Sequence, residues 1–176
     1  MFSNQIIELL DHCGVDHTGI VGFSLGGMVA RKFAQLNPTK VSALAILHSP
    51  HKRSVDAQDA VSLRVRLAEK DGPTSTVDAA LERWFTKDHR DAHPEQMELV
   101  RRWVLHTDPS IYHQNYRGLA DGVDEIVAPD PAIVAPTCVM TADEDFGNGP
   151  DMAHAIAAEI IVAEHWFFPA CDVWRQ

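Results

Sequence analysis

The chain has 176 residues, 45% hydrophobic and 23% charged, a composition that fits a soluble globular domain and excludes a disordered or fibrous protein. Its 25 acidic residues against 15 Lys and Arg give a net charge of −10, which disfavours binding to nucleic acid or to anionic membranes. No apolar run approaches the roughly 20 residues that span a bilayer, and the N-terminus lacks a basic signal-peptide start, so we expect a cytoplasmic protein.

Cysteine and histidine spacing indicates no metal site. Cys13, Cys138 and Cys171 are widely separated and form no C-x-x-C pair, which is typical of reduced thiols. The ten histidines include no H-E-x-x-H or comparable spacing. We therefore expect the histidines to be scattered rather than gathered around a metal.

Helical and strand patterns alternate over the first third of the chain. An apolar stripe over residues 6–13 predicts a helix, and the short apolar run 18–23 predicts a buried strand. A helical pattern follows from Leu25 to Leu36, and the run 41–47 predicts a second buried strand. This alternation at short spacing is typical of a parallel α/β sheet.

The middle of the chain changes character. From about residue 54 to residue 124, one amphipathic helical pattern follows another without a strand pattern between them. Strand patterns return at residues 137–141 and 165–168, with a helical pattern between them. We therefore predict a core domain of residues 1–53 and 125–176 that is interrupted by a helical insertion of residues 54–124.

The most specific motif is Gly22-Phe23-Ser24-Leu25-Gly26, a G-x-S-x-G pentapeptide where a predicted strand ends and a helix begins. This context is the one in which a serine nucleophile occupies a tight turn, the nucleophile elbow. We expect a strained Ser24, with Gly22 and Gly26 relieving collisions across the turn. The N–H of Leu25 should then point toward a developing oxyanion. The alternative is a plain Ser N-cap, which needs no glycine on both sides.

The elbow, the helix that ends at Asn37-Pro38 and the strand after it resemble the α/β-hydrolase fold. In the insertion, residues 80–86 (Ala-Leu-Glu-Arg-Trp-Phe-Thr) followed by His93-Pro94 are similar to the cap-domain helices of 3-oxoadipate enol-lactonases and their relatives. This likeness extends to about Ile160 and implies that residues 54–124 form a helical cap, or lid. Five aromatic residues of the cap could line an acyl pocket or belong to its core: Trp84, Phe85, Trp103, Tyr112 and Tyr116.

The resemblance implies the catalytic order serine, acid, histidine. The acid is expected in the loop after the third strand, three residues past the small residue that ends it, which favours Asp145 over Asp143 and Glu144. Its role would be to hold the imidazole in one tautomer and to stabilise the imidazolium. A solvated acidic loop is the alternative interpretation.

The histidine of the triad has no counterpart at the expected place. In similar proteins it follows the last strand, which here places it near Val173, where the sequence has none. Other candidates are His165, before or within the last strand, and His48 and His51, just past the second strand at the edge of the sheet that carries Ser24. Without a base, a serine is a weak nucleophile at neutral pH.

The N-terminus also departs from the family pattern. In similar proteins several strands precede the elbow, and a loop among them supplies a second oxyanion N–H, whereas this chain begins one helix before the elbow strand. We therefore expect a fragment with an incomplete sheet, that is, a partial α/β-hydrolase fold with a mostly parallel sheet. Strand 18–23 would be an exposed apolar edge at which the chain could self-associate.

The resemblance implies a serine hydrolase that acts on a small lactone or carboxylic ester through an acyl-enzyme, without cofactor or metal. The alternative is a truncated or degenerate fragment that has no catalysis, or a partner-binding module. A perhydrolase or a C–C bond hydrolase, which use the same elbow, is a third interpretation. The sequence contains no G-x-x-x-x-G-K-[ST] or G-x-G-x-x-G pattern that would favour a nucleotide phosphate site.

Overall fold

A computed structural model describes residues 2–145 and 147–168 of the chain. Their contacts divide them into two compact units, residues 2–52 with 122–168 and residues 53–121. The first unit contains the sheet and the elbow. Its elements are α1 (Phe2–Cys13), β1 (Thr18–Phe23), α2 (Leu25–Leu36), the 3₁₀ turn η1 (Pro38–Lys40), β2 (Val41–Leu47), β3 (Thr137–Ala142), α8 (Pro150–Ala158) and β4 (Ala163–Phe168).

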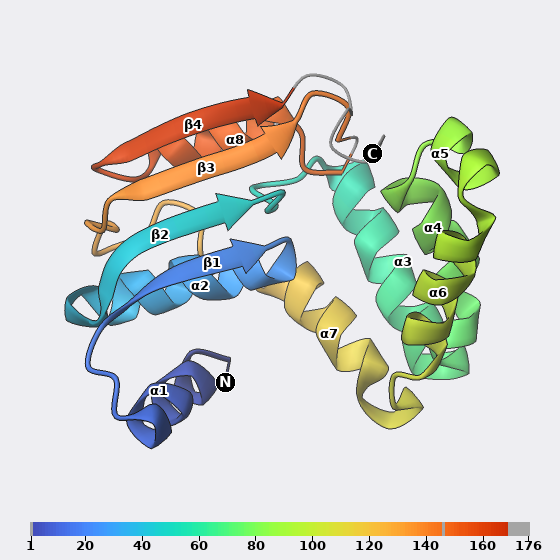
Figure 1. Ribbon diagram of the computed structural model, residues 1–176, viewed down its shortest axis with the longest axis horizontal. Helices are drawn as coiled ribbons and strands as arrows, with labels where there is room; N and C mark the ends of the chain where they lie inside the picture. The colour runs from blue at the N-terminus through green and yellow to red at the C-terminus, as the bar shows by residue number, and fades with distance from the viewer. Residues whose placement is uncertain (1, 146, 169–176) are drawn as a thin grey trace. The chain divides into compact units, whose positions relative to one another are not determined.

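The sheet has four strands in the order β1-β2-β3-β4, and every neighbouring pair is parallel. The register places Phe23 opposite Leu47 and Leu47 opposite Met140. The carboxyl ends of β1, β2 and β3 therefore lie together at one edge of the sheet, as Figure 1 shows. The predicted α/β class with a parallel sheet is confirmed.

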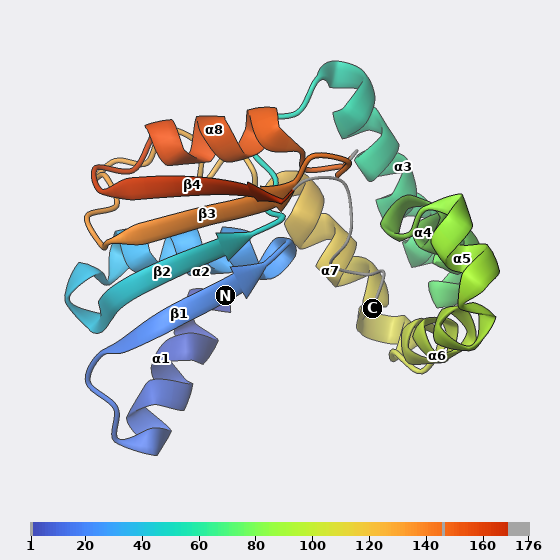
Figure 2. The same cartoon turned by 45° about the horizontal axis from the view of Figure 1, so that its top comes forward.

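Helices α2 and α8 cover one face of the sheet (Figures 1 and 2). The core between the helices and the sheet is apolar because one face of the sheet supplies apolar side chains to it and the helices supply a matching apolar stripe. Phe33 of α2, Ile46 of β2 and Ile156 of α8 are fully buried in this core. Helix α8, which begins at Pro150 and ends at Ala158, forms where a helical pattern was expected between the last two strands.

The opposite face of the sheet is open among the described residues. The strand predicted at 18–23 forms with these bounds, but Val21 and Phe23 of β1 are 71% and 61% exposed, so the prediction that it is buried is wrong. The physical reason is that β1 pairs with β2 alone in the described sheet, and its outward side chains have no covering layer. The expected apolar edge is therefore present at β1.

The second unit consists of helices, as the amphipathic patterns predicted. Helix α3 packs along α7, and the hydroxyl groups of Thr76 and Tyr112 lie 2.8 Å apart in the interior of the unit. Trp84 and Trp103 are more than half exposed. The elements are α3 (Val55–Asp71), the 3₁₀ turn η2 (Pro73–Ser75), α4 (Val77–Trp84), α5 (Lys87–Ala92), α6 (Pro94–Leu105) and α7 (Pro109–Asp121).

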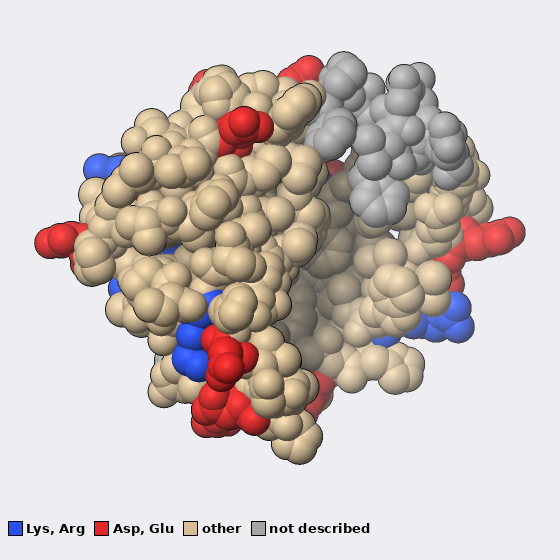
Figure 3. Space-filling view, turned by 60° about the vertical axis from the view of Figure 1, so that its left-hand side comes forward, with Lys and Arg blue, Asp and Glu red and all other residues tan. Residues whose placement is uncertain are grey.

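Charged side chains lie in small separate groups on the face drawn in Figure 3, with broad uncharged surface between them. That view shows no continuous basic patch among the described residues. Of the helices in residues 2–145 and 147–168, none combines the length and the apolar character that crossing a bilayer requires.

Candidate active site

Ser24 occupies a strained turn between β1 and α2. Its φ of 52° and ψ of −117° lie outside the regions that L-residues prefer, and its side chain makes no capping hydrogen bond to α2. An ordinary N-cap has extended backbone and a side chain bonded to the first turn, so the alternative of a plain N-cap is wrong. The backbone N–H of Ser24 donates to the carbonyl oxygen of Leu47 at 2.8 Å and so fixes the turn to the end of β2.

Close packing explains two of the three glycines near Ser24. A Cβ on Gly22 would lie 2.4 Å from the carbonyl oxygen of Gly26, and a Cβ on Gly27 would lie 2.6 Å from the side chain of Ser49. A Cβ on Gly26 would meet no atom within 4 Å because that residue faces outward. The prediction of a collision at Gly26 is therefore wrong. The positions at which a side chain would collide with neighbouring atoms are Gly22 and Gly27.

Leu25 begins α2, so its N–H belongs to the first helical turn, where no carbonyl four residues earlier can accept it within the helix. The N–H groups of Gly27 and Met28 both donate to the Ser24 carbonyl oxygen, at 3.0 and 3.4 Å. The start of the helix is thereby anchored beside Ser24. The prediction that the N–H of Leu25 stabilises an oxyanion is compatible with this position.

Asp145 is the acid that the loop after β3 turns inward. Its Oδ2 accepts a hydrogen bond from His48 Nδ1 at 2.7 Å, and its Oδ1 accepts the backbone N–H groups of Gly147 and Asn148 at 2.9 Å each. The side chain is 19% exposed. Asp143 and Glu144, in contrast, are exposed and make no side-chain hydrogen bond within the described part of the chain.

The hydrogen bonds to Asp145 outweigh the effect of its burial on its acidity. Burial by itself raises the pKa of this carboxyl, but the His48 ring and the N–H groups of Asn148 and Gly147 bring the pKa below its ordinary value. Asp145 is therefore ionised at neutral pH. A carboxylate in this state can hold an imidazole in one orientation and stabilise its protonated form.

The lowered pKa predicts a pH-dependent contribution of Asp145 to stability. Because the folded-state pKa is below the unfolded one, the stabilisation is present above about pH 4 and is lost as the pH falls through the folded pKa. We expect Asp145→Asn to lower the free energy of unfolding by about 1 kcal/mol at pH 7. Urea denaturation at a series of pH values should show the stability difference between the two proteins shrinking as the pH falls below the ordinary pKa of an aspartate, about 3.9. A difference that is independent of pH would contradict this account.

The structure brings one of the candidate histidines to Asp145. His48 follows β2 directly, and its backbone N–H donates to the Met140 carbonyl oxygen at 2.9 Å. The Nε2 of His51 instead lies 2.9 Å from Glu159 Oε1. His165 lies within β4, and its ring packs against that of His154 in α8, with 4.6 Å between centroids. The expected position near Val173 lies outside the described residues.

Arg31, Glu159 and His51 form a separate buried cluster. Arg31 is 1% exposed and donates to the carbonyl oxygens of Pro50 and Ile126 and to the Glu159 carboxylate. Burial lowers the pKa of Arg31 to about 10, although Glu159 acts in the opposite direction. This network ties α2 to the segments after β2 and α8, and it explains why His51 is held away from Asp145.

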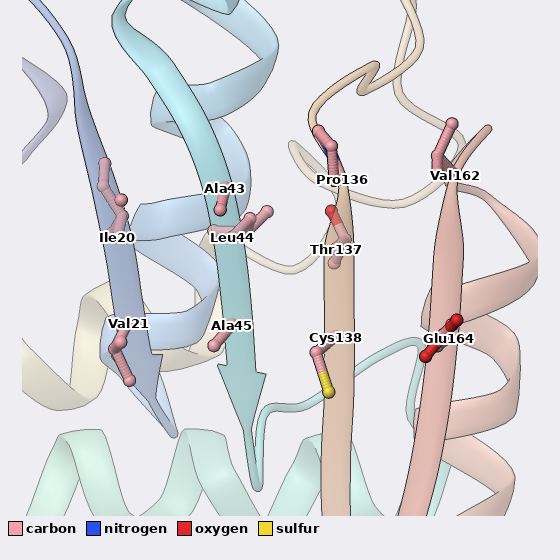
Figure 4. Close-up of a pocket in the computed structure, with 11 residues that line it drawn as sticks. Ile20, Val21, Ala43, Leu44, Ala45, Pro136, Thr137, Cys138, Val162 and Glu164 are labelled. Carbon is pink, nitrogen blue, oxygen red and sulfur yellow. The ribbon is translucent and has the colours of Figure 1, made fainter.

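A shallow hollow of about 530 Å³ lies on the open face of the sheet, away from Ser24. Val21, Ala45, Cys138 and Glu164 lie side by side on the four strands in this hollow (Figure 4). Burial raises the pKa of the Cys138 thiol, and Glu164 adds to this effect, so the thiol is not activated. Nothing in residues 2–145 and 147–168 groups three or more His, Cys, Asp or Glu in a way that could hold a metal ion.

Comparison with known families identifies the architecture. The model of the family described as "alpha/beta hydrolase fold" matches residues 1–169, nearly the whole chain. Among curated proteins, homoserine O-acetyltransferase of Thermus thermophilus is 50% identical over 43 residues, which are 24% of this chain and 11% of that protein. This match is strong but local.

Solved structures with the same fold include several hydrolases. A hydrolase from Pseudomonas aeruginosa PA01 has a TM-score of 0.83 at 22% identity, covering 96% of this chain. The enol-lactonase from Burkholderia xenovorans LB400 has a TM-score of 0.80 at 20% identity over 94%, and a thermophilic esterase from Thermogutta terrifontis has 0.80 at 22% over 95%. The chain spans 62% of the length of each of these proteins. At such identities the likeness establishes a common fold, and activity must be argued from the site.

Proposed function

The chain belongs to the α/β-hydrolase fold family, and from this we propose that it is a serine hydrolase acting on a small carboxylic ester or lactone through an acyl-enzyme. The observation that carries the proposal is the strained Ser24 on an elbow, at the same sheet edge as an ionised Asp145 bonded to a histidine. A strained serine at the same sheet edge as an acid–histidine pair is the arrangement that acyl transfer requires.

The chemistry of the proposed reaction has two halves. Ser24 Oγ attacks the carbonyl carbon while a base removes its proton, and the oxyanion that forms is stabilised by the N–H of Leu25. The alcohol leaves with a proton, and Ser24 carries the acyl group. Water then attacks the acyl-enzyme, so that one ester and one water give one acid and one alcohol, with Ser24 regenerated.

Two observations support a small lactone or ester as the substrate. The resemblance of residues 80–86 to enol-lactonase cap helices suggests a lactone, and the solved relatives include an enol-lactonase and an esterase. The direct test is turnover of p-nitrophenyl acetate by the folded chain, compared with Ser24→Ala. Release of p-nitrophenol by the wild type at the rate of the Ser24→Ala variant would refute the proposal.

A second candidate function is a partner-binding module without catalysis. The observation that favours it is the apolar edge strand β1, which pairs only with β2 among the described strands and whose Val21 and Phe23 are largely exposed. Such an edge can pair with a strand of a second copy of the chain or of another protein. A folded chain whose ester turnover is insensitive to Ser24→Ala would favour this candidate over the hydrolase.

A further inference from the structure

Asp145 has a histidine partner that comes from an unexpected place in the fold. His48 lies 97 residues before Asp145, directly after β2, rather than after the last strand. Its Nδ1 donates to Asp145 Oδ2 at 2.7 Å, and the hydroxyl of Thr141 lies 3.5 Å from the same nitrogen. In the neutral imidazole this places the proton on Nδ1 and leaves Nε2 as a proton acceptor.

The register of the sheet places His48 next to Ser24. Phe23 and Leu47 are paired across β1 and β2, and Ser24 and His48 are the residues that follow each of them. The backbone N–H of Ser24 donates to Leu47, and the Phe23 and His48 rings lie 5.5 Å apart. Serine, imidazole and carboxylate therefore leave the carboxyl ends of three neighbouring strands, β1, β2 and β3, in that order.

The backbone at His48 is also strained. Its φ of 47° is in the left-handed region, which is uncommon for a residue with a side chain, and Ser24 shares this feature at 52°. Such strain persists only where the surrounding structure imposes it, and it concentrates at functional sites. Here the hydrogen bond from the His48 N–H to Met140 holds the residue at the edge of the sheet while its ring turns to Asp145.

We propose that His48 is the general base of the site, so that Ser24, His48 and Asp145 form a catalytic triad whose histidine follows β2. This inference rests on the proposed hydrolase function. Nε2 of His48 takes the Ser24 proton as Oγ attacks the carbonyl, and the imidazolium returns it to the leaving alcohol. In the second half His48 takes a proton from water and gives it back to Ser24 when the acid leaves.

The proposed proton transfer requires a contact between Ser24 Oγ and His48 Nε2 in the complex with substrate. Ser24 Oγ and His48 form no direct hydrogen bond in the described residues, and the His48 side chain is 29% exposed. Catalytic hydrogen bonds are often long or absent without substrate and form in the complex, so the proposal places this contact in the substrate-bound state. His51 cannot substitute because Glu159 holds its Nε2, and His165 lies within β4 against α8.

The role of His48 can be tested by replacing it with glycine and adding free imidazole, and the left-handed backbone at position 48 suits this substitution. In His48→Gly the glycine accepts this backbone without strain, and the lost ring leaves space for free imidazole beside Asp145. We expect kcat/KM for p-nitrophenyl acetate to be about 100-fold or more lower in His48→Gly than in the wild type. Added imidazole should raise kcat/KM of this variant by about tenfold or more. The matched control is His51→Gln, because His51 is bonded to Glu159 and not to Asp145. Its kcat/KM should stay within about twofold of that of the wild type.

Each outcome has a defined meaning once circular dichroism shows that the variants are folded. Loss of turnover in His48→Gly, rescue by imidazole and absence of rescue in Ser24→Ala support the triad. Wild-type turnover in His48→Gly, while Ser24→Ala is inactive, would overturn the role of His48 and leave the hydrolase function intact. Loss without imidazole rescue would also overturn it, because a structural role predicts that result. Wild-type turnover no faster than that of Ser24→Ala would refute the hydrolase function itself.

Discussion

Ser24→Ala should lower kcat/KM for p-nitrophenyl acetate by about a thousandfold or more, because it removes the oxygen that forms the acyl-enzyme. Some rate above that of buffer should remain, since the Leu25 N–H and the binding surface are untouched by the substitution. Stability should change little. The Ser24 side chain caps no helix, and the hydrogen bonds of the turn come from its backbone.

The measurement for this prediction is steady-state release of p-nitrophenol by wild type, Ser24→Ala and Ser42→Ala. Ser42 is an exposed residue of β2, so its alanine variant controls for the loss of a serine from the same unit. Equal rates in the wild type and Ser42→Ala, with a large loss in Ser24→Ala, are the expected result. A loss shared by both variants would show that the effect is not specific to the elbow.

Gly22→Ala should destabilise the fold by about 3 kcal/mol, because the new Cβ would lie 2.4 Å from a carbonyl oxygen of the helix that follows Ser24. The contact is with backbone, so no side-chain rotation can relieve it. Either β1 or the start of α2 must move, and Ser24, which lies between them, would move with either. We therefore expect Gly22→Ala to lose ester turnover as well as stability.

The matched control for this substitution is Gly26→Ala, four residues away in the same turn. Its Cβ would meet no atom within 4 Å, and alanine is a better helix former than glycine, so stability should stay equal or rise by up to about 1 kcal/mol. Urea unfolding followed by circular dichroism measures both variants. Equal destabilisation by the two substitutions would contradict the packing described for the elbow.

Local patterns were sufficient to predict most of the fold. Strands such as 18–23 and 41–47 and the helices between them follow from apolar runs, helical stripes and prolines, which act over a few residues. The elbow at Ser24 was also predictable, because the motif and its strand-to-helix context are local. The helical character of residues 54–124 followed from periodicity in the same way.

Features that depend on distant neighbours were not predictable from the sequence. The exposure of Val21 depends on whether another layer covers its face of the sheet (Figure 4), and an apolar run looks the same on a covered face as on an open one. The freedom at Gly26 depends on the path of the backbone around it. The pairing of His48 with Asp145 joins residues far apart in the chain, and only the expectation that both follow strands of one parallel sheet hinted at it.

The most direct measurement is the site at which a fluorophosphonate probe modifies the folded chain, located by peptide mapping with mass spectrometry. The probe reacts with a serine only when a neighbouring base makes its oxygen nucleophilic. We predict one adduct, on the peptide that contains Ser24, and no adduct in Ser24→Ala. A folded wild-type chain that takes up no probe, or that carries it on another residue, would contradict the assignment of Ser24 as an activated nucleophile.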